Sequence, residues 1–147
     1  MTNVVEFAIV KRIMSILKLD EAGKISKFFE SIVKDAKRAI AQLESNKKSL
    51  ALQYEIDVDQ YNEKIEDATA VVESTYENVT LEDIKTNADI ESFKTRYLHN
   101  VGIAEKSLKS AEKSLERYKE NYAKQVEEID EQIVKYQSRI DKIVNLK

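Results

Sequence analysis

Residues 104–117 read AEKSLKS (104–110) followed by AEKSLER (111–117), two nearly identical heptads in tandem. Ala104, Leu108, Ala111 and Leu115 recur at alternating steps of four and three, and the positions between them are charged or polar. This spacing places the apolar side chains along one stripe of an α-helix. The repeat therefore predicts a helix that packs through a heptad seam, as in a coiled coil.

The same spacing continues on both sides of this repeat and predicts a long helix over residues 88–145, with Ile90 as its first seam residue. Earlier in the chain, a similar pattern predicts another long helix over residues 24–73. Asn46 falls on the predicted seam of that helix, where a polar residue lowers stability but can fix the register. Two helices with matching seams indicate an all-α protein.

The two seams fit together when the chain folds back so that the numbers of facing residues sum to 165. Tyr54 then faces Ala111, and Tyr61 faces Ala104, so that a ring lies opposite a methyl group at each level. Pairing large with small side chains fills the space between two helices without voids. The predicted fold is a long antiparallel helical hairpin, a coiled coil, with its tip at about residues 74–90.

A short apolar amphipathic helix is predicted to precede the hairpin, over residues 3–19. In the predicted register Lys147 faces Lys18, so residues 1–17 have no partner on the returning helix. The sequence therefore divides into an N-terminal helix, 1–19, and a hairpin, 20–147. The apolar side chains that we expect to form an oligomer or partner interface are Val5, Phe7, Ile9, Val10, Ile13, Met14, Ile16 and Leu17.

Composition narrows the class of protein. The chain has 147 residues, 35% of them charged, and contains no proline, cysteine or tryptophan. This length normally corresponds to one domain, and the lack of cysteine excludes disulfides and zinc–thiolate sites. No secretory signal and no apolar run long enough to span a bilayer are visible. We therefore expect a cytoplasmic protein or a component of an intracellular assembly.

The net charge of −3 is unevenly distributed: residues 1–48 carry +4, residues 53–91 carry −10, and residues 92–147 carry +3. The acidic block either pairs with basic residues of the returning helix, among them Lys94 and Lys106, or docks a basic partner. The acidic residues assigned to the tip are Glu73, Glu77, Glu82, Asp83, Asp89 and Glu91.

No constellation of residues indicates catalysis. His99 is the sole histidine, and Gly23 and Gly102 are the sole glycines, so a multi-histidine metal site and a glycine-rich phosphate loop are both excluded. We therefore expect no enzyme activity, catalytic residue, cofactor, metal or small-molecule substrate. The chain is acidic overall, and its local basic cluster is short, which disfavours nucleic acid as a partner. That cluster consists of Lys34, Lys37, Arg38, Lys47 and Lys48.

Several apolar residues fall outside the seam of a two-helix hairpin, which buries one stripe of each helix. They are Phe28, Val33, Ile40, Leu52, Ile56, Ile103, Val134 and Val144. Together with the N-terminal helix, they favour a homo-oligomeric structural or scaffold protein, a hairpin subunit that binds itself or docks on a larger assembly.

Two other functions remain open. The order of an amphipathic helix followed by a long hairpin is similar to that of bacterial phage-shock and ESCRT-III-like membrane-remodelling proteins. This resemblance implies that residues 3–19 anchor the chain at a membrane surface. The hairpin also resembles the coiled-coil arms of prefoldin, which implies a holdase-like chaperone, although the chain lacks strand-forming blocks.

Overall fold

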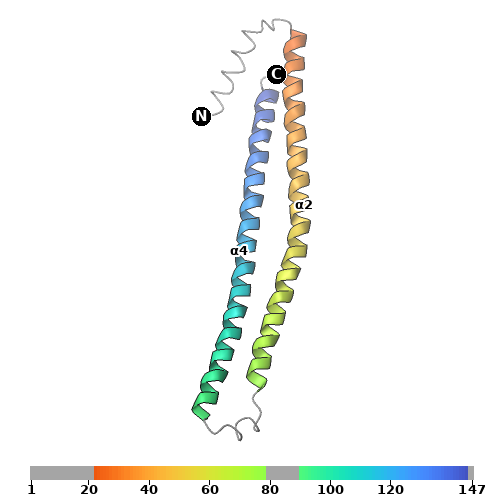
Figure 1. The fold of residues 1–147 in the computed structure, drawn as a ribbon. Coiled ribbons are helices and arrows are strands. Elements are labelled where there is room, and N and C mark those ends of the chain that lie inside the picture. Colours follow the sequence, from red (N-terminus) through yellow and green to blue (C-terminus); the bar gives the residue numbers. More distant parts are fainter. Residues whose placement is uncertain (1–21, 79–89, 146–147) are drawn as a thin grey trace. The chain divides into compact units, whose positions relative to one another are not determined.

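The computed structural model describes residues 22–78 and 90–145, apart from the side chains of residues 22, 23 and 25. Helix α2 spans Ala22–Glu77 and helix α4 spans Ile90–Asn145 (Figure 1). These described residues contain no β-strand, and the two helices pack against each other in opposite directions. The predicted all-α helical hairpin is therefore confirmed. α2 also continues to Glu77, four residues into the segment assigned to the tip.

Burial along α4 follows the heptad spacing. Val101, Ala104 and Leu115 are buried, and Leu108 and Ala111 are half-buried, while the residues between them are exposed. These side chains lie three or four residues apart, so that they share one face of the helix. The seam read from residues 104–117 is therefore the packing surface of α4.

The structure divides into two compact units, each made of one segment of α2 and one of α4. Unit 1 comprises residues up to 46 and from 128 onward, and its buried residues are Ala36 and Ile140. Unit 2 comprises residues 47–127, and its buried residues are Val101, Ala104 and Leu115. Both cores are thin, as expected where each helix has one neighbouring helix.

The predicted register is wrong in unit 2. Tyr54 was expected to face Ala111, but its ring stacks on that of Tyr118, seven residues further along α4, with the centroids 5.8 Å apart. Tyr61 was expected to face Ala104, but its ring lies 5.2 Å from that of Tyr118. Displacement along the seam by whole heptads keeps apolar residues opposite apolar residues, so that heptad spacing does not select one register among them.

Unit 1 shows a shift in the same direction. Ile143, expected to face Ala22, lines a groove together with Val33 and Lys37. The described end of α4 therefore lies further along α2 than predicted. The first turns of α2 extend beyond it (Figure 1).

Two predicted seam residues are exposed. Asn46 lies on the surface, where the side-chain amide of Gln42 donates a 2.9 Å hydrogen bond to its Oδ1. The half-buried residue at this level is Lys47, since the seam takes a step of four residues after Leu43 instead of three. Ile90 is 60% exposed because it is the first residue of α4.

Candidate functional site

The predicted N-terminal interface lies outside the described residues. Its eight apolar side chains, from Val5 to Leu17, all belong to the segment 1–21. Their role in assembly stays a prediction.

The acidic tip is described in part. Glu73 and Glu77 at the end of α2 and Glu91 at the start of α4 are exposed, whereas Glu82, Asp83 and Asp89 fall outside the described residues. Within residues 22–78 and 90–145, none of these three exposed carboxylates forms an ion pair.

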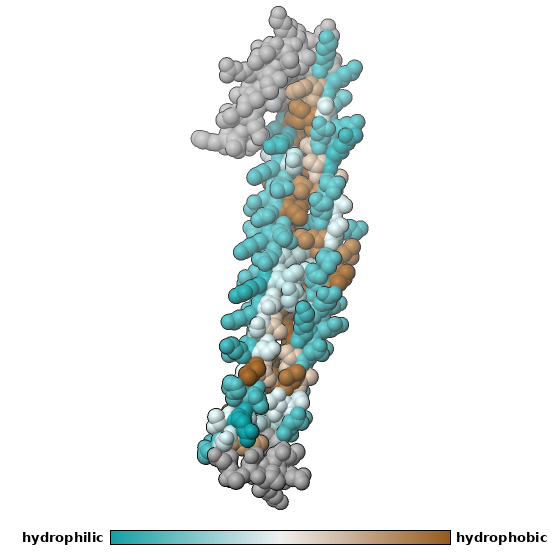
Figure 2. Space-filling view, viewed as in Figure 1, coloured by the Kyte–Doolittle hydropathy of each residue, from teal (hydrophilic) through white to brown (hydrophobic). Residues whose placement is uncertain are grey.

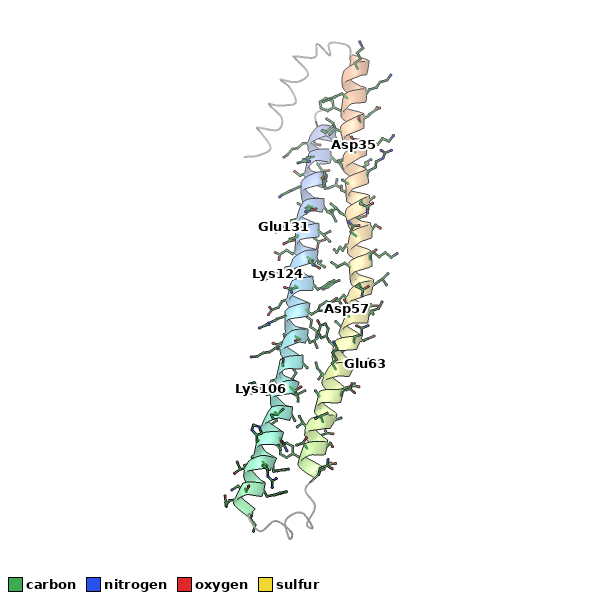
Figure 3. The ribbon with its side chains drawn as sticks, in the orientation of Figure 1. Asp35, Asp57, Glu63, Lys106, Lys124 and Glu131 are labelled. Atoms are coloured by element: carbon green, nitrogen blue, oxygen red, sulfur yellow. The ribbon has the colours of Figure 1, made fainter. Side chains whose placement is uncertain are left out.

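The predicted charge matching between the helices does not occur among the described residues. Lys94, Arg96, Lys106 and Lys109 form no ion pair there. Figure 3 shows why Glu63 and Lys106 do not pair. Glu63 projects from the side of α2 away from α4, and Lys106 projects from the side of α4 away from α2. Glu63 therefore points away from the returning helix, whereas Asp57 of the same helix faces it and is hydrogen-bonded to Tyr118.

Four tyrosines form a cluster on the seam of unit 2, here called the tyrosine cluster: Tyr54, Tyr61, Tyr118 and Tyr122. The rings of Tyr54 and Tyr122 stack with their centroids 4.0 Å apart and their planes 20° from parallel. Tyr118 lies between Tyr54 and Tyr61, at 5.8 Å and 5.2 Å from their centroids. Such aromatic pairs add stabilisation beyond the burial of their area. The sequence predicted these residues on the seam. It did not predict that their rings contact one another, because each ring was expected to face a methyl group.

A hydrogen bond from Tyr118 to Asp57 completes this cluster. The Tyr118 hydroxyl donates to Asp57 Oδ2 at 2.5 Å, and Gln53 Nε2 donates to Asp57 Oδ1 at 2.8 Å. These donors, Tyr118 first, lower the pKa of Asp57. The same bond to a carboxylate, with burial as a smaller cause, raises the pKa of Tyr118 to about 12. Tyr118 thus stays protonated at neutral pH and acts as a hydrogen-bond donor, not as a base.

A second tyrosine pair closes the end of unit 2. Tyr97 Oη donates to the backbone carbonyl of Tyr76 at 2.9 Å, which satisfies an acceptor in the last turn of α2. Tyr76 Oη donates to Glu105 Oε1 at 2.6 Å, and this bond raises the pKa of Tyr76. Both tyrosines therefore tie the end of α2 to α4.

Unit 1 carries an open groove of about 520 Å³. Val33 and Ala41 of α2 line it together with Ile143 and Val144 near the end of α4. The charged residues at its rim are Glu30, Lys34, Lys37 and Arg38. The groove therefore combines an apolar floor with a rim of net positive charge. The sequence showed the basic cluster, but not that Ile143 and Val144 lie beside it.

Large apolar side chains are exposed along both helices. Figure 2 shows brown, hydrophobic patches between teal, hydrophilic side chains on the face in view. Leu52 and Ile56 on α2 are 58% and 53% exposed, and Ile103, Val134 and Val144 on α4 are exposed to a similar degree. Of the apolar residues predicted to lie outside the seam, these five are indeed exposed, while Phe28, Val33 and Ile40 are half-buried.

Among the described residues, no group of three or more histidine, cysteine, aspartate or glutamate side chains is arranged to hold a metal ion. His99 is exposed. In the same part of the chain, neither α2 nor α4 has a stretch apolar enough to cross a bilayer.

Comparisons with protein-family models, with curated proteins and with solved structures find no match to this chain.

Proposed function

We propose that the protein is a non-enzymatic structural or assembly subunit, a helical hairpin that binds copies of itself or docks on a larger assembly. The observation that carries this proposal is the surplus of exposed apolar surface. Leu52, Ile56 and Val134 each expose more than half of their surface, although the hairpin seam is complete without them. Exposed side chains of this kind, when they gather, are typical of surfaces that bind another protein.

The N-terminal segment adds to this argument. Residues 3–19 contain the most apolar stretch of the chain, and burying one leucine, isoleucine or phenylalanine contributes about 1.5–3 kcal/mol. A partner protein or a second copy would provide that burial. Self-association through this segment is therefore the first contact to test.

The test is the solution mass of the full chain, measured by size-exclusion chromatography with light scattering over a range of protein concentration. We expect a mass greater than that of the 17.0 kDa monomer. The variant Val10→Asp/Ile13→Asp should shift the distribution toward monomer, whereas Lys11→Asp/Ser15→Asp, which changes polar positions of the same segment, should not.

A monomer at every concentration for the full chain would contradict self-assembly. Flotation with vesicles of anionic lipid tests the alternative that residues 3–19 bind a membrane surface. If the monomeric chain floats and the aspartate variant of the apolar positions does not, residues 3–19 bind lipid and the assembly proposal fails.

A further inference from the structure

The outer face of α2 carries one pattern of positions twice, with opposite charge. Lys34, Lys37, Arg38 and Ala41 occur at relative positions 0, 3, 4 and 7. The second occurrence has the same spacing with acidic residues in place of basic ones, and it consists of Glu63, Glu66, Asp67 and Ala70. Side chains spaced by three and four residues share one face of a helix.

Both occurrences are on the surface. All eight side chains are exposed, and none of the six charged ones forms an ion pair with another described residue. The basic set belongs to unit 1, where it forms part of the groove rim, and the acidic set belongs to unit 2. Charges left unpaired on an exposed helix face are free to meet a complementary surface.

A second copy of the same chain presents such a complementary surface. The two sets are 29 residues apart on one continuous helix, and residues so far apart in a helix do not meet each other. A second copy brings them together. We infer that two chains associate through the outer faces of α2 in antiparallel orientation, so that the basic set of each copy faces the acidic set of the other. This inference rests on the proposed self-assembly and specifies its surface.

An antiparallel pair satisfies both contacts at once, because a two-fold axis repeats each of them. In this orientation Lys37 faces Asp67 of the second copy, and Arg38 faces Glu66 of the second copy. The midpoint between the two sets falls at Leu52, which is 58% exposed and belongs to the same spacing. Leu52 therefore meets its counterpart at the axis, and Ile56 lies one turn further along the same face, beside this contact. Ala41 and Ala70 are small, so that the backbones approach closely beside the charged pairs.

The pattern also accounts for the exposed apolar pair in the middle of α2. Leu52 and Ile56 lie outside the hairpin seam, and the residues on both sides of them along this face are polar or charged. A short apolar centre with a charged surround is the usual organisation of a protein–protein interface. Surface ion pairs are individually weak, and salt screens them. The association should accordingly weaken as the salt concentration rises.

The first experiment exploits the lack of cysteine in the native chain. Leu52→Cys places one thiol at the expected axis, and Leu98→Cys places one at a comparably exposed site of α4. Under mild oxidation in the full chain, Leu52→Cys should form a covalent dimer at least about tenfold faster than Leu98→Cys, because the two thiols are held at high effective concentration. Equal rates would overturn the inference.

The second experiment exchanges the charges. Lys37→Glu/Arg38→Glu should weaken association by more than about tenfold, because like charges then face each other. Glu66→Lys/Asp67→Lys should do the same, and the quadruple variant should restore association. Lys106→Glu/Lys109→Glu, which changes the net charge equally on the outer side of α4, is the control and should have little effect.

The outcomes separate the two proposals. If the native chain forms an oligomer but the quadruple variant fails to recover, the surface is wrong while self-assembly stands. If the native chain stays monomeric, self-assembly and its surface both fail. If the Lys37 and Arg38 variant loses binding to anionic vesicles while the mass of the protein is unchanged, the basic rim binds lipid, and the inference is overturned.

Discussion

Unit 1 and unit 2 are built from the same two helices, yet the side chains that hold them differ in kind. The buried residues of unit 1, Ala36 and Ile140, are aliphatic, and its aromatic pair, Phe28 with Phe29, lies within α2. The seam of unit 2 includes the tyrosine cluster and the hydrogen bond from Tyr118 to Asp57. Aliphatic contacts tolerate sliding by a heptad, whereas stacked rings and hydrogen bonds have preferred geometries. Unit 2 is therefore the part of the hairpin whose side-chain contacts specify the register.

The largest effect should come from truncating the seam itself. Leu115→Ala in unit 2 should lower the free energy of unfolding by about 2–3 kcal/mol, because it removes a buried side chain and leaves a cavity. Ile140→Ala in unit 1 should cost a similar amount, since both are less than a tenth exposed. Urea unfolding followed by far-UV circular dichroism measures both. Leu98→Ala, at an exposed position, is the control and should change stability by less than about 0.5 kcal/mol.

A double-mutant cycle on Tyr54 and Tyr122 measures how much the stacked rings stabilise unit 2. The stacked pair should show a coupling energy of about 0.5–1.5 kcal/mol beyond the sum of the single effects of Tyr→Leu replacement. An equivalent cycle on Val33 and Ile143, aliphatic residues that line the same groove of unit 1, should give less. Equal coupling in the two units would contradict the view that unit 2 alone carries directional contacts.

The pH dependence of stability should report the bond between Tyr118 and Asp57. The pKa of Tyr118 is raised from 10.0 to about 12 in the folded state, so that its contribution is complete below pH 10 and is lost as pH rises toward 12. The pKa of Asp57 is lowered, so that its contribution is present above the normal value of 3.8 and is lost as pH falls below it.

Thermal melts of the native chain and of Tyr118→Phe test this expectation. The native melting temperature should fall between pH 10 and pH 12 by more than that of the variant. Parallel pH profiles would show that the hydrogen bond does not contribute to stability.

The smallest effect is expected at Asn46. Its side chain is exposed and contacts Gln42 of the same helix, so Asn46→Ala should change stability by less than about 0.5 kcal/mol. Chemical denaturation is the measurement. Removing a buried polar group from a seam would instead raise the free energy of unfolding. An increase of about 1 kcal/mol or more would therefore mean that Asn46 lies between the helices.

The sequence was sufficient for the fold class because helix periodicity is a local property. The spacing of Val101, Ala104 and Leu115 depends on the geometry of a single helix, and these residues are buried as predicted. The register depends on contacts between distant residues, such as Tyr54 with Tyr118, that a seven-residue period does not distinguish. For the same reason, the sequence revealed the basic cluster around Lys37 but not that Val144 completes a groove beside it.

The distribution of tyrosines gives the molecule two independent optical signals. The chain has no tryptophan, and its tyrosines apart from Tyr136 belong to unit 2. The tyrosine band of the near-ultraviolet circular dichroism spectrum, which arises from tyrosine side chains in fixed surroundings, therefore reports mainly on unit 2. Far-ultraviolet dichroism reports on helix in both units. Melting curves recorded in the near and far ultraviolet can therefore be compared on the unlabelled protein. Coincident curves mean that the two units unfold together, and separate curves mean that they do not.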